Sequence, residues 1–572
     1  MPSGDRLAPR AAPHPDPLLL FVLALGAAFL LTNLGATSLW TDEAETGCLA
    51  RNILHFGVPK AFDGVNYVSQ RVVAGREDFN QSLVWVLSPW LQLYVAAASF
   101  AALGVSNLAA RLPFALVGIA NLWMIYHLAL VIFADRRIAR LAALLLVFCI
   151  PFLLHMRQGR YYALVVFFTM AVVSTYLRLL EGRRRSALLL VLSIALLFHS
   201  NYGVCLPAVV ALVIHAAFFA RSRIELGTAV AVGAGVVALT APYAVYAEIY
   251  RTSSLLDLRY FRFNLLNYLI TINNYVLPLA LVLLVLALRL AARRSPSQPS
   301  VATVLSFFQP GVALLLLVVA TSLLFASSSA NYFFRYAINL VPLLVVIHAA
   351  LLIELADRAG HRFGSRVGTA LLWALVPITL FTTLTAQPVF PLLRALEARA
   401  PREPWADDPR LRRPRAEYAS LSSEIFDFVY EITHPFRGPD SAIADFLKSH
   451  AEPGDVVVVQ YGDVPLIFYT GLTVRGVNQG VPFPREPDWI VPRAFESPAS
   501  LIRFAREHGY HEYVLDVADT RWENQPDPYS HKFRSEPVAK PGTDGYPPIV
   551  VYGRSRKAPD ADGPGAPPDA RS

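Results

Sequence analysis

Three carboxylates stand directly after the first apolar run of the chain. Residues 39–47 read Leu-Trp-Thr-Asp-Glu-Ala-Glu-Thr-Gly, with Asp42 next to Glu43 and Glu45 two residues further on. A carboxylate at the mouth of an apolar helix can take the proton of a substrate hydroxyl, and its neighbour can orient it. The spacing of Asp42 and Glu45 also fits a capping box for a helix reaching about residue 55. Base chemistry and helix capping are both open for this segment.

A second group combines guanidinium and aromatic side chains. Residues 155–162 read His-Met-Arg-Gln-Gly-Arg-Tyr-Tyr, with Arg157 and Arg160 three residues apart and Tyr161 and Tyr162 behind them. Guanidinium groups match phosphate oxygens with paired hydrogen bonds, so this spacing indicates phosphate binding. Anchoring in the aromatic belt of a membrane surface is the equally plain alternative.

Other segments carry side chains of the same kinds. These further residues are Arg259, Arg262, Arg335, His199 and Tyr336. We assign the three arginines to phosphate binding, and the other two, together with Tyr161 and Tyr162, to substrate contact. Each one alone is typical of an interface anchor or a polar group at a helix end. Whether they form one site depends on the elements that carry them.

Composition identifies those elements as membrane helices. The chain has 572 residues, of which 55% are hydrophobic and 16% charged, and its mean hydropathy is +0.44. Soluble domains carry about a quarter charged residues, and disordered chains are polar, so both classes are excluded. The net charge of +8 comes from basic residues between apolar runs, which indicates membrane orientation rather than nucleic-acid binding.

Eleven apolar runs have about the length needed to cross a bilayer, roughly 20 residues. They are 18–36, 109–133, 138–155, 161–180, 186–200, 204–220, 226–246, 268–291, 303–325, 336–356 and 367–388. A further run, 82–103, contains Pro89 and Gln92, and we interpret it as a juxtamembrane or re-entrant helix. This predicts a polytopic α-helical membrane protein of about eleven spans.

Basic loops predict the orientation of these spans. Five short basic loops fall on the side of the N-terminus if 82–103 does not cross, and such loops are normally cytoplasmic. We therefore expect a cytoplasmic tail at 1–17 and a membrane domain at 18–388. Its first outer loop, 37–108, is large, and the carboxylates and arginines above all face outside.

The composition changes after residue 388. Helical patterns at 442–450, 464–469 and 500–508 alternate with strand patterns at 455–460, 511–516 and 548–552. This alternation predicts a small extracytoplasmic α/β domain over 389–553 with a mostly parallel sheet. The Pro- and Gly-rich tail, 554–572, is expected to be disordered.

Several of these pieces together resemble a known class of enzymes. They are Trp40-Thr-Asp42-Glu43-Ala44, the helix with Pro89, Ala109-Ala-Arg111-Leu-Pro113, Phe133-Ala-Asp-Arg136-Arg137, Arg157-Gln-Gly-Arg160-Tyr161-Tyr162, and Phe334-Arg335-Tyr336 before a span with Pro342. In this order the chain is similar to the GT-C membrane glycosyltransferases, which use polyprenyl-phosphate sugars. The similarity is greatest to the branch of protein O-mannosyltransferases and lipopolysaccharide-sugar transferases, and it covers about residues 18–388.

The resemblance implies an inverting hexosyl or pentosyl transfer from a polyprenyl-phosphate sugar to a hydroxyl of a lipid, an envelope glycan or a protein. It makes Asp42 the catalytic base and Glu43 its neighbour in the site, with Arg157, Arg160 and Arg335 near the lipid phosphate. Ser88-Pro89-Trp-Leu stands where the protein mannosyltransferases have His-Pro-Pro-Leu, which puts a protein acceptor in doubt.

Cofactor, location and alternative functions complete the expectations. No cofactor is certain, although the couplet Asp42-Glu43 can contact Mg²⁺ or Ca²⁺, which prefer oxygen ligands. The expected location is the inner (cytoplasmic) membrane, with the active site outside it. The alternatives are a lipid-saccharide flippase, which predicts broken helices meeting at mid-membrane, and a non-catalytic envelope-assembly protein.

Overall fold

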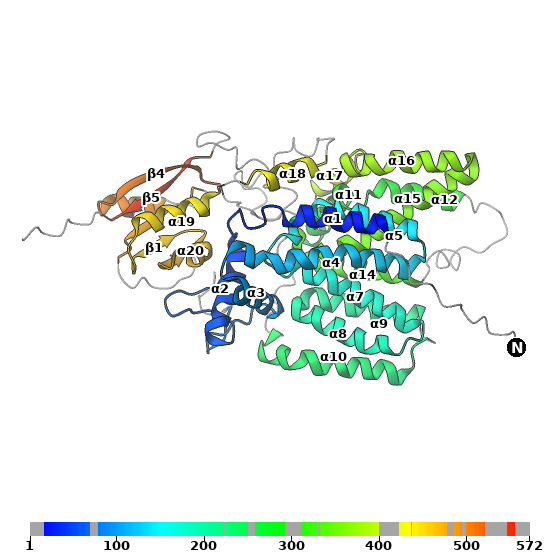
Figure 1. The fold of residues 1–572 in the computed structure, drawn as a ribbon, viewed down its shortest axis with the longest axis horizontal. Coiled ribbons are helices and arrows are strands. Elements are labelled where there is room, and N and C mark those ends of the chain that lie inside the picture. Colours follow the sequence, from blue (N-terminus) through cyan, green and yellow to red (C-terminus); the bar gives the residue numbers. More distant parts are fainter. Residues whose placement is uncertain are drawn as a thin grey trace, which may run out of the picture.

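The computed structural model shows a bundle of long helices with a small sheet domain at one end (Figure 1). It describes residues 16–68, 78–220, 223–249, 258–291, 310–329, 332–399, 423–435, 437–476, 486–494, 499–520 and 546–554. Nearly all of the predicted cytoplasmic tail and of the predicted disordered tail lies outside these residues.

Each predicted apolar run contains helix. The bundle consists of α1 (Pro17–Leu31), α4 (Asn107–Phe133), α5 (Arg136–Val147), α6 (Ile150–Met156), α7 (Tyr162–Leu180), α8 (Arg185–Ser200), α9 (Tyr202–Phe219), α10 (Leu226–Tyr246), η2 (Leu258–Tyr260), α11 (Phe261–Tyr275), α12 (Leu279–Ala291), α14 (Pro310–Ser327), η3 (Phe334–Leu340), α15 (Val341–Phe363) and α16 (Ser365–Phe381). These helices lie side by side along the long axis of the molecule (Figure 1).

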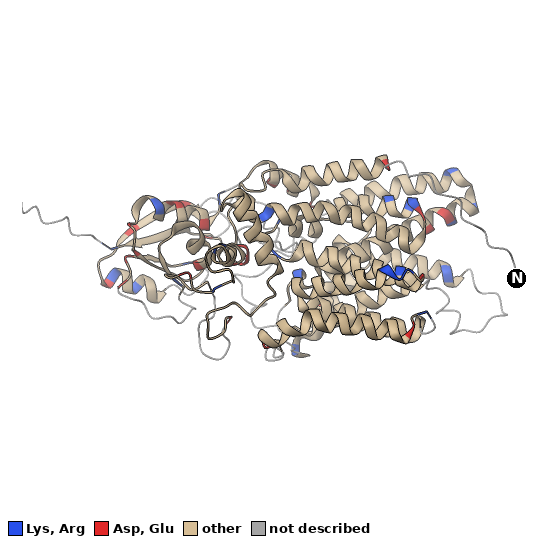
Figure 2. Cartoon of the chain, turned by 60° about the horizontal axis from the view of Figure 1, so that its bottom comes forward, with Lys and Arg blue, Asp and Glu red and all other residues tan. Residues whose placement is uncertain are grey.

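The length of the helices supports fewer complete spans than the eleven runs. Within the described residues, six helices are long and apolar enough to cross a membrane, or eight if two bent pairs each form one span. The runs that fall short are α1, α8 and α16, which are apolar but have 15, 16 and 17 residues. Many Lys and Arg residues of the bundle lie at the end where the N-terminus is marked, and its middle is almost free of charge (Figure 2).

Two of the spans are broken, which the apolar pattern did not predict. α5 and α6 bend by 65°, and α11 and α12 bend by 84°. Pro151 stands in the first turn of α6 and Pro278 directly before α12. Proline lacks the backbone N–H that continues a helix, so each break falls where a proline follows within three residues.

Two helices, α2 (Thr41–Phe56) and α3 (Leu91–Leu103), lie between the bundle and the sheet domain (Figure 1). α2 ends at Gly57, whose φ of 74° suits a glycine without a side chain. α3 has 13 residues, or about 20 Å of helix, which is too short for the roughly 30 Å hydrocarbon core. This length agrees with the juxtamembrane helix expected at 82–103.

The sheet domain contains the predicted helices and strands together with two strands that were not predicted. After α17 (Phe390–Glu397) and α18 (Ile425–Thr433), its elements are α19 (Pro439–His450), β1 (Val456–Val459), α20 (Asp463–Thr470), β2 (Thr473–Gly476), β3 (Trp489–Val491), α21 (Ala499–Glu507), β4 (His511–Ala518) and β5 (Pro548–Gly553). The strand order is β2-β1-β3-β5-β4. β1 pairs in parallel with β2 and β3, whereas β5 pairs antiparallel with β3 and β4. The sheet is therefore mixed, and the prediction of a mostly parallel sheet is wrong.

The sheet domain is joined to the segment before α2 by one tyrosine. The hydroxyl of Tyr469, on α20, accepts a 2.7 Å hydrogen bond from the backbone N–H of Leu39. The same hydroxyl donates to Oδ1 of Asn107, at the start of α4, also at 2.7 Å. Behind it, a Cβ at Gly47 of α2 would lie 2.8 Å from the ring of Phe468, so α20 packs closely on α2. The sheet domain thus fixes the start of α2.

We expect Tyr469→Phe to lower the free energy of unfolding by about 1–3 kcal/mol, because the N–H of Leu39 loses its described acceptor. The measurement is the unfolding of the full chain in detergent. Tyr430→Phe is the matched control, since Tyr430 is 51% exposed on α18. Equal stability of the two variants would show that the tyrosine link contributes nothing.

Candidate active site

Asp42 lies in the first turn of α2 with its carboxylate between two guanidinium groups. Its Oδ2 is 3.7 Å from Nη2 of Arg160 and 3.7 Å from Nη2 of Arg335. The side chain of Asp42 is 21% exposed, while those of the two arginines are 10% and 16% exposed. The carboxylate is therefore held in place by cations and can still be reached from outside.

Arg160 binds the first turns of α2 through hydrogen bonds. Its Nη1 donates to the backbone carbonyl of Asp42 at 2.8 Å, to Oε1 of Glu45 at 3.0 Å and to Oγ1 of Thr46 at 3.0 Å. One guanidinium thus binds three groups of the same helix. We infer that Arg160 mainly sets the position of Asp42.

Arg335, in η3, is held differently. Its guanidinium carbon lies 4.1 Å from the ring centroid of Phe333 and 5.6 Å from that of Trp40. Among the described residues, its one ion pair is the contact with Asp42. Its guanidinium is stacked on rings rather than bound in a row of short hydrogen bonds, so it suits a transient anion better than Arg160 does.

Glu43 points to a different partner from Asp42. Its two carboxylate oxygens accept from Nε and Nη2 of Arg111, on α4, at 2.8 and 2.6 Å, and Oε1 also accepts from the N–H of Gly159 at 2.7 Å. The side chains of Glu43 and Arg111 are 0% and 2% exposed. Arg111 also donates to the carbonyls of Thr37 and Ser38, just before α2. The pair is buried structure that joins α2 to α4.

Arg157 is three residues from Arg160 but binds a different helix, α1. Its Nη1 and Nη2 donate to three carbonyls at the end of α1, those of Phe29, Leu30 and Thr32, at 2.8, 3.0 and 2.9 Å. Helix ends leave such carbonyls without intrahelical partners, so Arg157 satisfies them. The structure does not bring Arg157 to Asp42.

Tyr161 and Tyr162 are 7% and 0% exposed and meet edge to face, with ring centroids 4.7 Å apart. Membrane anchoring is therefore the wrong interpretation for both tyrosines, because a belt residue faces lipid and water. Tyr336, next to Arg335 in η3, is half-buried and packs its ring on Phe333. These three rings surround the arginines near Asp42.

The remaining candidates lie apart from Asp42. Arg259 packs over its neighbour Tyr260, and Arg262 is exposed at the start of α11. His199 ends α8, where its Nε2 contacts the carbonyl of Leu239 on α10 at 3.0 Å. The described ion pairs of Asp42 are with Arg160 and Arg335 instead.

The capping interpretation of α2 is wrong in detail. The helix begins at Thr41 with Trp40 as its cap residue, and no side chain caps it. Asp42 is already inside the helix, and Glu45 binds Arg160 instead of a backbone N–H. The expected end near residue 55 is confirmed, since α2 ends at Phe56.

Glu45 gives the site a dependence on pH. Burial raises the pKa of Glu45 to about 7, although Arg160 lowers it. Because the folded protein favours the neutral carboxyl, the raised pKa of Glu45 contributes to stability. This contribution is fully present below pH 4.5, the ordinary pKa of the group, and is lost as the pH rises through about 7.

We expect Glu45→Gln, which stays neutral, to flatten the pH dependence of thermal unfolding between about pH 4.5 and 7. Unfolding midpoints across this range test it, with Glu507→Gln on the exposed face of α21 as the control. A slope in Glu45→Gln equal to that of the unmodified chain would contradict the assignment.

The described residues contain no group of three or more His, Cys, Asp or Glu side chains arranged to hold a metal ion. The carboxylates of Asp42, Glu43 and Glu45 instead contact arginines. A divalent cation at the couplet would have to displace these contacts.

Comparison with known proteins gives one family and one fold. Residues 88–246 match the family described as dolichyl-phosphate-mannose-protein mannosyltransferase. No curated protein matches the chain. The crystal structure of ArnT from Cupriavidus metallidurans bound to undecaprenyl phosphate is 14% identical with a TM-score of 0.54, covering 93% of this chain and 97% of ArnT. Its apo state is 15% identical, with the same TM-score and coverage. The chain is thus similar to this mannosyltransferase family over residues 88–246 and shares its overall fold with ArnT.

Proposed function

We propose that the chain transfers a hexosyl or pentosyl group from a polyprenyl-phosphate donor to a hydroxyl acceptor on the outer face of the inner membrane. The acceptor is a lipid, an envelope glycan or a protein. The observation that carries the proposal is the carboxylate of Asp42, partly exposed and held between Arg160 and Arg335. The undecaprenyl phosphate bound to ArnT supports the class of donor.

Asp42 is the base in this proposal. Its carboxylate takes the proton of the acceptor hydroxyl as the acceptor oxygen bonds to the anomeric carbon of the sugar. The bond from that carbon to the phosphate oxygen breaks on the opposite face, and the phosphate leaves with the electron pair. The configuration at the anomeric carbon inverts, and one base suffices because a phosphate leaves without a strong acid.

Arg335 receives the phosphate. Negative charge develops on the leaving oxygen, and a cation fixed beforehand stabilises such charge most effectively. Arg335 fits this role because aromatic rings hold its guanidinium and its one described ion pair is with Asp42. Tyr161, Tyr162 and Tyr336 shape the surroundings, and Glu43 positions α2 through Arg111.

The orientation follows from the charge pattern. We infer that all eleven apolar runs cross or enter the membrane, with the N-terminus in the cytoplasm and the sheet domain outside. The basic loops at the end of the bundle away from the sheet domain support this arrangement (Figure 2). Asp42 then lies at the outer surface, where a lipid-bound donor is already oriented toward the acceptor.

The purified chain, in vesicles, is to be assayed with a panel of radiolabelled polyprenyl-phosphate hexoses and pentoses and with an envelope lipid extract. We expect label to pass covalently to one acceptor fraction. Release of free polyprenyl phosphate in equal amount would confirm transfer. Movement of intact donor across the vesicle membrane without covalent transfer would support the flippase alternative and contradict the proposal.

A further inference from the structure

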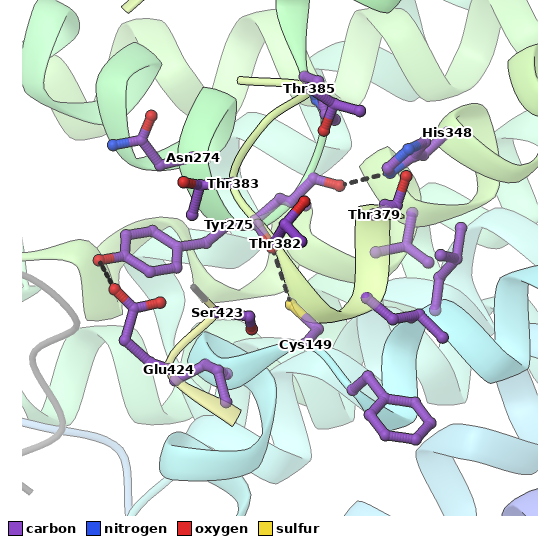
Figure 3. A pocket seen from close by; sticks show the side chains of 17 residues that line it. Cys149, Asn274, Tyr275, His348, Thr379, Thr382, Thr383, Thr385, Ser423 and Glu424 are labelled. Carbon is purple, nitrogen blue, oxygen red and sulfur yellow. Dashed lines mark hydrogen bonds between the residues drawn. The ribbon is translucent and has the colours of Figure 1, made fainter. Parts of the chain in front are cut away.

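A cavity lies where the two broken spans meet (Figure 3). Its wall includes Cys149 at the break between α5 and α6, and Val276 and Pro278 at the break between α11 and α12. α15 and α16 complete it, whereas Asp42 and Arg335 are not among its lining residues.

The lining is unusually polar for a bundle of apolar helices. It contains hydroxyl, amide and imidazole groups, from Asn274, His348, Thr379, Thr382, Thr383 and Thr385. Glu424 is its one acidic residue, and no Lys or Arg lines the cavity in the described part of the chain. A phosphate is therefore poorly matched, while a neutral ligand rich in hydroxyl groups fits these side chains.

Two buried atoms in this wall need hydrogen-bond partners. Nδ1 of His348 donates to the carbonyl of Val276 at 2.9 Å, which leaves Nε2 of the neutral ring as an acceptor. That Nε2 and Oγ1 of Thr379 are buried and have no partner among the described residues. Leaving a buried polar group unpaired costs free energy, so a ligand or water that satisfies both atoms is favoured.

The two broken spans also indicate a ligand site. Irregular backbone at membrane depth is tolerated where it is buried in protein or lines a cavity, and discontinuous helices often form substrate sites. His348 lies seven residues, about 10 Å, along α15 from its start at Val341, so the cavity is inside the bundle near its sheet-domain end. Figure 3 shows His348 and Thr379 on one side of the cavity and Tyr275 and Glu424, joined by a 3.1 Å hydrogen bond, on the other.

We propose that this cavity binds the neutral saccharide headgroup of a glycolipid or a free sugar. Sugar hydroxyls donate to Nε2 of His348 and pair with Oγ1 of Thr379, and the Tyr275–Glu424 pair supplies further polar contacts opposite. The site is separate from the arginines around Asp42, and its existence does not depend on which residue acts as base in the transfer proposed above.

Native mass spectrometry of the full chain in a detergent without sugar headgroups tests this site. The probes are monoglucosyl diacylglycerol, phosphatidylglycerol with the same acyl chains, and free glucose. We expect the unmodified chain to retain the glucolipid in preference to phosphatidylglycerol. Thr379→Val and His348→Leu should each weaken glucolipid binding about tenfold, which corresponds to one hydrogen bond.

Thr240→Val is the matched control, because Thr240 lies on α10 and its hydroxyl bonds within that helix. Thermal unfolding of each variant confirms that it is folded, and His348→Leu serves if Thr379→Val does not fold. Glucose that displaces the glucolipid identifies the sugar as the recognised part, and no displacement identifies the whole glycolipid; both support the site. Equal retention of the two lipids, or glucolipid binding unchanged in both variants, would overturn it.

Asp42→Asn separates this inference from the proposed function. The variant should retain the glucolipid as the unmodified chain does, because Asp42 does not line the cavity. Glucolipid binding by an unmodified chain that transfers no sugar would leave the site standing and remove only the proposed function. Transfer without preferential glucolipid binding would remove only the site.

Discussion

Asp42→Asn is expected to lower the rate of sugar transfer by about 10²- to 10⁴-fold, the usual contribution of a positioned base. The amide cannot accept the hydroxyl proton as a carboxylate does, yet it has nearly the same shape between Arg160 and Arg335. We expect kcat to fall while KM for the polyprenyl-phosphate donor changes little, because the donor contacts the arginines. Labelled-sugar transfer in vesicles gives both constants.

A matched variant shows whether this loss is specific to Asp42. Asp445→Asn makes the same chemical change in an exposed ion pair with Arg437, where the Asp445 side chain is 55% exposed. It should transfer sugar at the rate of the unmodified chain. Full activity of Asp42→Asn would exclude Asp42 as the base, and equal loss in both variants would indicate general damage.

Arg111→Met is expected to destabilise the fold by about 3–5 kcal/mol, because it leaves the carboxylate of Glu43 buried without its charge partner. The carbonyls of Thr37 and Ser38, which Arg111 holds, also lose a donor. Denaturant unfolding in mixed micelles measures the change. Sugar transfer should fall as well, since this pair fixes the start of α2.

Two further variants separate the buried pair from a general effect of losing an arginine. Arg137→Met removes an exposed arginine that is 57% accessible, and exposed pairs contribute about 0–1 kcal/mol. The double variant Glu43→Leu with Arg111→Met replaces the pair by apolar side chains and should recover much of the lost stability. A loss below about 1 kcal/mol in Arg111→Met would refute the structural role of the pair.

Features that depend on local sequence were predicted well. Every apolar run contains helix, and the helix and strand patterns after residue 388 gave α19, α20, α21, β1, β4 and β5. β1 was recognised as a continuous apolar run, whereas β2 (Thr-Val-Arg-Gly) has no apolar pattern and β3 (Trp-Ile-Val) has only three residues. β2 and β3 form the two parallel pairs with β1, whereas β5 pairs antiparallel with β3 and β4.

The partners of the charged residues could not be predicted. Arg157 and Arg160 stand three residues apart in one segment, yet one binds the end of α1 and the other binds α2, because the turn between α6 and α7 points them in different directions. Glu43 and Arg111 are 68 positions apart. One signal was available for Arg111, since an arginine at the outward end of a span is unfavourable there without a partner. Pro151 and Pro278 mark the two broken spans, which the apolar runs alone do not reveal.

The hydrogen bond between Leu39 and Tyr469 has a consequence for how the protein is made. The two residues are 430 positions apart, so at about 5–20 residues per second the ribosome needs roughly 20–90 s to add the second after the first. Until α20 has been made, a nascent chain therefore lacks this contact at the start of α2. On the function proposed above, a chain that ends before α20 would hold Asp42 less firmly and transfer sugar poorly.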